Sequence, residues 1–359
     1  MPGTADARRS VLLVRVLAFG DVLLTLPVIE ALANSSRVSH VDLLTSVEYA
    51  EEARRSPYVR RVYGFDAATG IVEPSLAGVE YGLLADLHTR GVPLDPALEQ
   101  LMDEVPARDR VGFVSPYSPS PAQYSLPARQ RDEHAVEYYA RAVAPLLDAP
   151  LGDGRIAIAD VDRAAADLRL PPGAVLLAPG ARYPWKRWPA DRYAQLADRL
   201  RVAGFSPVLV GHHFDRPYIE AVQSRCSVPV ESLVDDAYPV AAAMAASGLV
   251  VANNSGLTAL ANAAGAYVVC VHSHTLPVMW RPWGPHHADV AADDRQAPCG
   301  CAGPAPHDLA TPCGKNIPVD EVFDAVLRLD AVRRITLGAA SAEARDDRPA
   351  SPDPGWERS

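Results

Sequence analysis

Four short segments of the chain carry residue types that could bind and transfer a charged group. In chain order they are Phe19-Gly20-Asp21, residues 179–188, residues 211–215 and residues 253–257. Each follows a predicted strand. In parallel sheets, ligands collect at the carboxyl ends of the strands, beside the N-termini of the following helices. We therefore expect the four segments to surround one cleft.

Two carboxylates in these segments are candidates for distinct roles. Asp21 follows the first predicted strand, where it could take a proton from an attacking hydroxyl as a general base. It could instead cap the following helix, and it can do both only if the cap leaves one oxygen free. Asp215 could accept hydrogen bonds from a ribose, as an acidic residue does in dinucleotide-binding folds, or could be a surface charge.

Residues 179–188 concentrate cations and tryptophans in a chain that is otherwise acidic. Arg182, Lys186 and Arg187 lie there beside Trp185 and Trp188. The only other lysine in the sequence is at position 315. A lysine is well suited to meet a phosphate as a point charge, so Lys186 and Arg182 are predicted to bind an anionic donor. The alternative is that the tryptophans anchor the loop and the cations are solvated.

Residues 253–257 follow a buried strand and open a helix. The backbone N–H groups and the hydroxyl of Ser255 could hold a diphosphate, and Gly256 would let a phosphate approach the backbone. Asn254 and Leu257 belong to the same predicted site. A plain Asn/Ser helix cap, with the glycine packed on the sheet, would give the same pattern.

Polar residues elsewhere are weaker candidates. In the first half, His88, Arg90 and His134 are assigned to an acceptor site. In the second half, His272 and His274 follow a buried strand and could either line the cleft or pack the loop.

The cysteines do not form a recognisable metal motif. Cys299, Cys301 and Cys313, with His307 between them, match none of the usual structural-zinc spacings. We therefore assign no metal ligand and expect no cofactor. Five cysteines in all, an odd number in a long chain, fit a reducing compartment better than a disulfide scaffold.

Composition narrows the possible partners. A formal net charge of −10 argues against nucleic-acid binding, which needs a concentrated basic face. The apolar run from Val11 to Val28 is interrupted by Arg15 and Asp21, so it is expected to be a buried strand and a helix rather than a membrane span or signal peptide. A cytoplasmic location, with at most peripheral membrane contact, is the resulting expectation.

The elements that position these segments alternate between strand and helix. Such alternation predicts an α/β protein with parallel sheets covered on both faces. Strands are expected at 11–16, 41–44, 62–65, 81–87, 175–178, 206–210, 249–251 and 267–271. Helices are expected from Asp21 to Leu32, at 47–55, 133–147 and 190–203, and from Gly256 onward, with a loop at 114–131.

The length of 359 residues favours two domains. We predict an acceptor-side Rossmann-like domain at 1–160 and a donor-binding Rossmann-like domain at 161–336. Beyond about Leu337 apolar periodicity stops, and residues 337–359 are expected to be a disordered tail.

Taken together, the segments resemble glycosyltransferase family 9, the heptosyltransferases that use ADP-heptose to build the inner core of lipopolysaccharide. The matching motifs are residues 20–27, Asp86-Leu87-His88, residues 179–181, residues 186–189 and residues 254–257. The resemblance implies a GT-B fold, two Rossmann-like domains facing across a cleft, and a metal-independent inverting reaction. It also implies Asp21 as the base, Lys186 and residues 255–257 at the donor phosphates, and Asp215 at the adenosine ribose.

Two positions depart from the family pattern. An acidic residue is usual where this chain has Asn254, and a histidine where it has Ala259. The donor is therefore expected to be an ADP-linked heptose or a related sugar, and the acceptor a saccharide or a secondary metabolite. The alternatives are a GT-B epimerase, for which acid and base groups on both sugar faces are not identifiable, and an inactive nucleotide-sugar-binding module.

Overall fold

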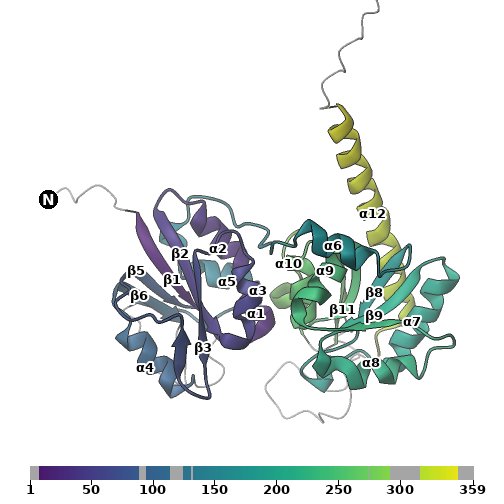
Figure 1. Cartoon of the computed structure of the whole chain (residues 1–359), viewed down its shortest axis with the longest axis horizontal. Helices are drawn as coiled ribbons and strands as arrows, with labels where there is room; N and C mark the ends of the chain where they lie inside the picture. The colour runs from purple at the N-terminus through teal and green to yellow at the C-terminus, as the bar shows by residue number, and fades with distance from the viewer. Residues whose placement is uncertain are drawn as a thin grey trace, which may run out of the picture.

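The chain forms two α/β halves, each built on one sheet (Figure 1). The computed structural model describes residues 8–88, 94–113, 124–130, 132–273, 275–291 and 316–346. The described strands of the first half lie between residues 9 and 126, and those of the second half between 174 and 291. The predicted α/β class is therefore confirmed. The exact domain boundary at 160/161 stays a prediction.

The first sheet has the order β4-β3-β2-β1-β5-β6-β7, parallel except for the antiparallel β3–β4 pair. Its strands are β1 (Arg9–Val14), β2 (Val38–Ser46), β3 (Arg61–Asp66), β4 (Ile71–Glu73), β5 (Tyr81–Asp86), β6 (Ala107–Phe113) and β7 (Tyr124–Leu126). β1 is central and carries the unbroken apolar run that a strand buried on both faces requires.

The second sheet is parallel throughout, in the order β10-β9-β8-β11-β12-β13. Its strands are β8 (Ala174–Ala178), β9 (Ser206–Gly211), β10 (Ser232–Val234), β11 (Leu249–Asn253), β12 (Tyr267–His272) and β13 (His287–Ala291). The order reverses direction between β8 and β11, which is where ligands bind in open sheets of this kind.

Helices cover both sheets. In the first half they are α1 (Phe19–Leu23), α2 (Leu26–Ala33), α3 (Ala50–Arg54), α4 (Pro96–Glu104) and α5 (Ala135–Arg141). In the second half they are α6 (Asp160–Asp167), α7 (Ala190–Val202), α8 (Arg216–Gln223), α9 (Ala237–Ser247), α10 (Gly256–Ala263), α11 (Pro277–Trp280) and α12 (Val319–Asp346). No helix in these described ranges is long and apolar enough to cross a membrane.

One hydrophobic core runs continuously from the first half into the second. It includes Val22 and Ile29 on one side and Leu257 and Leu260 on the other. The connection between the halves lies along this junction: the Gly152 N–H donates to Pro27 O, and the Ile156 N–H donates to Ala263 O. The helices α1 and α10 meet there (Figure 1).

The structure corrects several sequence-based boundaries. The helix expected from Asp21 to Leu32 is two helices, α1 and α2, because Pro27 cannot donate a helical hydrogen bond and its ring crowds the preceding turn. The expected loop at 114–131 contains strand β7. The helix expected at 133–147 is the shorter α5 followed by a 3₁₀ turn at Ala144–Leu146.

The C-terminal helix also extends beyond the predicted start of the tail. α12 continues through Asp346, and in Figure 1 it projects away from the second half. The sequence interpretation relied on apolar periodicity, whereas residues 337–346 are rich in alanine, which has a high helix propensity. The remaining part of the predicted tail, 347–359, lies outside the described residues.

Candidate functional site

Asp21 is held at the junction between the halves by three groups of the first half. Its Oδ1 accepts a hydrogen bond of 2.7 Å from the Tyr139 hydroxyl. Its Oδ2 lies 3.1 Å from Nη2 of Arg15 and accepts from the Ala18 N–H at 3.3 Å. Asp21 is the third residue of α1, and its Oδ2 accepts from the N–H of the N-cap residue Ala18. It therefore caps the helix from inside the first turn rather than as the N-cap residue itself.

These partners keep Asp21 ionised. Burial opposes ionisation, but the Arg15 guanidinium and the Tyr139 hydroxyl outweigh it and lower the pKa of Asp21. The sequence did not single out Tyr139, which lies in α5 and is fully buried. Arg15 could have been singled out, because a charged residue inside an apolar run is unusual. Its partner could not be identified from the sequence alone.

The loop after β8 is anchored by Trp188. This side chain is fully buried, and its indole Nε1 donates to Ile317 O at 3.1 Å. The Trp188 N–H donates to Oδ1 of Asn253 at 2.9 Å, while Nδ2 of Asn253 donates to Pro179 O at 2.6 Å. Asn253 thus connects both ends of the loop to the end of β11. The anchoring role considered for the tryptophans therefore holds for Trp188.

The three cations of this loop have different surroundings. Lys186 ends a 3₁₀ turn, and burial lowers its pKa although the Asp21 carboxylate opposes that shift. Lys186 and Asp21, from opposite halves, thus lie within electrostatic range of each other. Nε of Arg187 donates to Ala181 O at 2.9 Å, and its guanidinium lies over the Tyr218 ring. Arg182 is exposed.

Ser255 is the N-cap residue of α10 but makes no side-chain cap bond. Its Oγ is buried and has no hydrogen-bond partner among the described residues. A buried hydroxyl without a partner is costly, so a ligand oxygen at this helix N-terminus would be favoured.

Gly256 lets the two halves touch. A Cβ on Gly256 would lie 2.8 Å from Cδ1 of Phe19, and a Cβ on Gly20 would lie 3.3 Å from the Gly256 Cα. The absence of both side chains allows α1 and α10 to meet. The structure shows that the approach of the other half requires a glycine here. The expected approach of a phosphate to Gly256 stays a prediction.

A cavity of about 1080 Å³ opens beside this contact, between the two halves. Of the predicted donor residues it is lined by Arg182, Asp215, Ser255, Gly256 and Leu257. Lys186, Asn254 and Asp21 do not line it. The volume is suited to a ligand the size of a nucleotide sugar.

Asp215 lies at the wall of this cavity against two glycines. A Cβ on Gly180 would overlap Oδ1 of Asp215, and one on Gly211 would lie 2.9 Å from the Asp215 Cβ. Its Oδ2 accepts from the His212 N–H at 3.0 Å. Burial raises the pKa of Asp215. The carboxylate is thus held at the cavity wall, rather than being a loose surface charge.

Aromatic rings on the cavity wall were missed by the sequence interpretation. Phe214 is 86% exposed, and its ring stacks on His212 with centroids 4.8 Å apart. Tyr49 reaches the cavity from the first half. Phe214 could have been identified from the sequence, because it is an aromatic residue in a polar loop after a strand and directly precedes Asp215.

The predicted acceptor residues are engaged in the fold. Nε2 of His88 accepts from the Val16 N–H at 3.1 Å, and its Nδ1 lies 2.6 Å from Oδ1 of Asp86. His134 caps α5 through Nδ1, and its Nε2 lies 2.9 Å from Arg281 O in the other half. Neither histidine lines the cavity. A role of these two histidines in acceptor binding stays a prediction.

Several predicted positions fall outside the described residues. These are Arg90, His274, His307, Cys299, Cys301 and Cys313. His272 is described and is buried, but it does not line the interdomain cavity.

The model of glycosyltransferase family 9 (heptosyltransferase) matches residues 105–302, more than half of the chain. The chain belongs to glycosyltransferase family 9. A search of curated proteins finds no significant match.

Solved structures of family 9 proteins share the fold. A family 9 glycosyl transferase from Veillonella parvula is 18% identical with a TM-score of 0.72, the match covering 91% of this chain and 98% of that chain. The E. coli ADP-heptose lps heptosyltransferase II is 17% identical with a TM-score of 0.70, covering 90% and 99%. E. coli heptosyltransferase WaaC with ADP is 17% identical with a TM-score of 0.67, covering 89% and 99%. The predicted GT-B fold is therefore confirmed.

The two departures from the family 9 pattern have structural partners in this chain. Nδ2 of Asn254 donates to Trp280 O at 2.7 Å, a bond that an acidic residue could not make when ionised. The Cβ of Ala259 would lie 3.7 Å from a Cβ on Gly20, so the small side chain packs at the α1–α10 contact. Both residues therefore fit the local packing.

Proposed function

We propose that this protein transfers heptose or a related sugar from an ADP-linked donor to an acceptor hydroxyl, with inversion at the anomeric carbon. The observation that carries the proposal is the close approach of Gly20 to Gly256, which brings the helix turn of Asp21 to that of Ser255. Asp21 is ionised and within electrostatic range of Lys186, and the Ser255 hydroxyl has no partner among the described residues. A base, a cation and an anion-binding helix terminus are the groups that displacement at a sugar phosphate requires.

The second half would hold the donor. The Ser255 hydroxyl and the first N–H groups of α10 would bind the diphosphate, with Gly256 and Leu257 at the same turn. Lys186 would add positive charge from the neighbouring loop, and Arg182 would do so from the cavity wall. Asp215 would accept hydrogen bonds from the ribose. Heptosyltransferase WaaC with bound ADP has the same fold, which supports an adenosine diphosphate donor.

The transfer would proceed as a direct displacement. The acceptor oxygen forms a bond to the anomeric carbon while its proton passes to Asp21, and the bond from that carbon to the diphosphate oxygen breaks. The released electron pair leaves on ADP, whose charge Lys186 and the α10 N-terminus stabilise. Each carboxylate oxygen has two acceptor positions, so Oδ1 can take the proton while it still accepts from Tyr139.

Positive charge for the leaving group would come from the protein, so the proposed transfer needs no metal at the diphosphate.

The acceptor would be a saccharide or a small secondary metabolite bound on the side of the first half. Residues 1–160 would form that side and 161–336 the donor side. A cytoplasmic location would give access to nucleotide sugars.

The first experiment is a thermal-shift panel of ADP, UDP and GDP with their sugars, since a ligand that binds only the folded state raises its melting temperature. We expect a selective ADP response that is larger with ADP-heptose. Mass spectrometry of a reaction with candidate acceptors then checks for ADP release and a glycosylated product. A selective UDP or GDP response would overturn the heptose donor. Binding without donor consumption across the acceptor panel would favour a non-catalytic binding module.

A further inference from the structure

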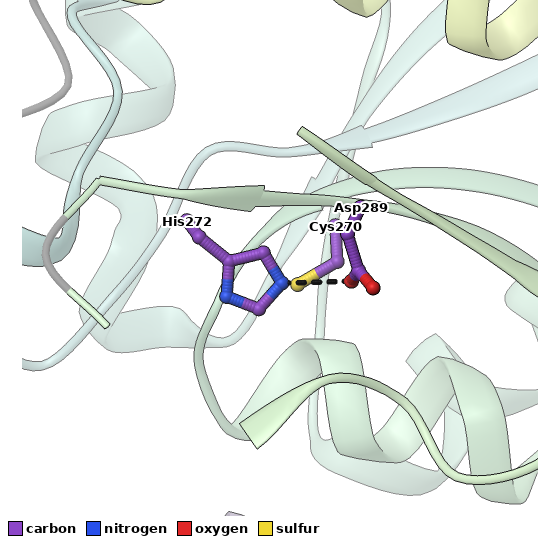
Figure 2. Close-up of side chains that lie close together, drawn as sticks. All are labelled: Cys270, His272 and Asp289. Atoms are coloured by element: carbon purple, nitrogen blue, oxygen red, sulfur yellow. Dashed lines mark hydrogen bonds and ion pairs between the residues drawn. The ribbon is translucent and has the colours of Figure 1, made fainter. Parts of the chain in front are cut away.

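Three potential metal ligands converge on one face of the second sheet. Cys270 and His272 are two residues apart on β12, so their side chains point to the same face. Asp289 lies on β13 directly opposite Cys270 in the strand register. Figure 2 shows the three side chains turned toward one another.

The potential ligand atoms are close together and largely shielded from water. The Cys270 thiol, a ring nitrogen of His272 and a carboxylate oxygen of Asp289 all lie within 4.8 Å of one another. Nε2 of His272 lies 2.8 Å from Oδ1 of Asp289, the contact dashed in Figure 2. Cys270 and His272 are buried, whereas the Asp289 side chain is 21% exposed. Asp289 is therefore the member of the cluster that solvent reaches.

Surrounding residues orient these three groups. Nδ1 of His272 lies 3.2 Å from the Thr275 hydroxyl, so it can donate there and leave Nε2 as the ligand atom. Nε2 of His287 lies 3.4 Å from Oδ2 of Asp289. Nδ2 of Asn254 lies 3.6 Å from the Cys270 sulfur, where it can donate to a thiolate. Outer partners of this kind are typical of metal ligands.

We propose that Cys270, His272 and Asp289 form a binding site for a thiophilic divalent cation, with Zn²⁺ as the best match. Thiolate, imidazole and carboxylate are the three ligand types that zinc takes in proteins, and three protein ligands leave one position for water. Binding requires small adjustments of the side chains and releases the thiol proton to solvent.

The three residues are not among those proposed to bind the donor, and none of them lines the interdomain cavity. The Cys270 thiol nevertheless lies within electrostatic range of Lys186. The cation would cross-link β12 to β13 beside Asn254, the residue that precedes the donor loop Ser255–Leu257. The inference does not depend on the proposed function. It adds a metal site where the sequence predicted none, because Cys270 and His272 belong to a strand and their partner Asp289 comes from another.

The test is metal content and spectroscopy on the full chain. The protein is stripped with a chelator and titrated with Zn²⁺ against a competing indicator, and separately with Co²⁺, whose bond to a thiolate gives an intense near-ultraviolet absorption band. We expect one equivalent of tightly bound metal, a Co²⁺–thiolate band and a higher melting temperature with Zn²⁺.

Single substitutions test whether the metal binding and the Co²⁺ band come from this cluster. Cys270→Ser and Asp289→Asn should each weaken Zn²⁺ binding at least tenfold, and Cys270→Ser should abolish the Co²⁺ band. Cys226→Ser is the matched control, because Cys226 is the other described cysteine and lies outside the cluster. It should leave both signals unchanged.

Two results would overturn the site. One is a Co²⁺ band and Zn²⁺ content that persist in Cys270→Ser. The other is loss of both signals only when Cys299, Cys301 and Cys313 are replaced together by serine. Asp289→Asn, at the least buried member of the cluster, keeps the test valid if Cys270→Ser does not fold, which circular dichroism monitors.

Discussion

The hydroxyl of Tyr139 donates a hydrogen bond of 2.7 Å to Oδ1 of Asp21, across 118 positions of the sequence. Tyr139 comes from α5 and Asp21 from α1, and Arg15 holds the other carboxylate oxygen. The carboxylate therefore has a fixed orientation before any ligand binds. A base that is ionised and oriented in advance is suited to take a proton from an acceptor hydroxyl.

Replacing Asp21 with asparagine should abolish transfer while leaving donor binding nearly intact. The amide keeps the shape of the side chain but cannot take a proton, and general-base catalysis contributes about 10²–10⁴-fold to rate. ADP release measured with saturating donor and acceptor should fall by that factor. Donor affinity, measured by calorimetry, should change less than threefold. Turnover retained in this variant would rule out Asp21 as the base.

Replacing Tyr139 with phenylalanine should shift the acid limb of kcat/KM to higher pH. The lost hydrogen bond favours the ionised carboxylate, so its removal raises the pKa of Asp21. The base is then protonated sooner as pH falls. A hydrogen bond to a charged group is worth about 1.5–3 kcal/mol, which corresponds to a shift of about 1 to 2 pH units.

Tyr138→Phe is the matched control for that measurement. Tyr138 neighbours Tyr139 but stacks on Phe113, with ring centroids 3.8 Å apart. The pH profile of kcat/KM for Tyr138→Phe should match that of the wild-type protein. Equal acid limbs in Tyr139→Phe and Tyr138→Phe would contradict the role of the Tyr139 hydroxyl.

Much of this arrangement could be predicted from the sequence. Short apolar runs alternating with helical patterns identify the two sheets, and residues after the strands identify the cavity wall at Asp215 and Ser255. Tyr139 and Asn253 could not be found in this way, because their roles depend on contacts with distant segments. The helical extension of α12 to Asp346 was missed for a different reason: helix propensity persists there without apolar periodicity.

Replacing Lys186 with alanine should weaken donor binding by about 10–100-fold. This range follows from about 1.5–3 kcal/mol for a hydrogen bond to a charged group. Calorimetry with ADP and with adenosine separates the effect, since adenosine has no phosphate and should bind both proteins equally. Lys315→Ala removes the only other lysine of the chain and is the control for general loss of charge. An unchanged ADP affinity in Lys186→Ala would remove this residue from the phosphate site.

Replacing Gly256 with alanine should disturb the contact between the halves. The new methyl group would lie 2.8 Å from the Phe19 ring, and overpacking of this kind costs about 1–3 kcal/mol. Both the melting temperature and donor affinity should fall, because Phe19, Gly256 and the cavity adjoin one another.

The same clash can be relieved from the other half. Phe19→Ala removes the ring, so the double variant Phe19→Ala/Gly256→Ala should be more stable than the sum of the single effects predicts. A double-mutant cycle from denaturant unfolding measures this coupling. Additive effects would mean that the two residues do not contact each other in solution.

Asn254→Asp restores the acidic residue usual in family 9, but it should raise neither the stability nor the transfer rate of this protein. In this chain Nδ2 of Asn254 donates to Trp280 O, and an ionised aspartate would instead face that carbonyl with a negative charge. Leaving the buried acceptor without a donor costs about 1–3 kcal/mol. The free energy of unfolding, measured with a chelator present, should fall by this amount. Asn34→Asp, at the exposed C-terminal end of α2, should lower it by no more than about 0.3–1 kcal/mol through the helix dipole. Higher stability together with faster transfer in Asn254→Asp would show that position 254 contacts the sugar rather than the neighbouring backbone.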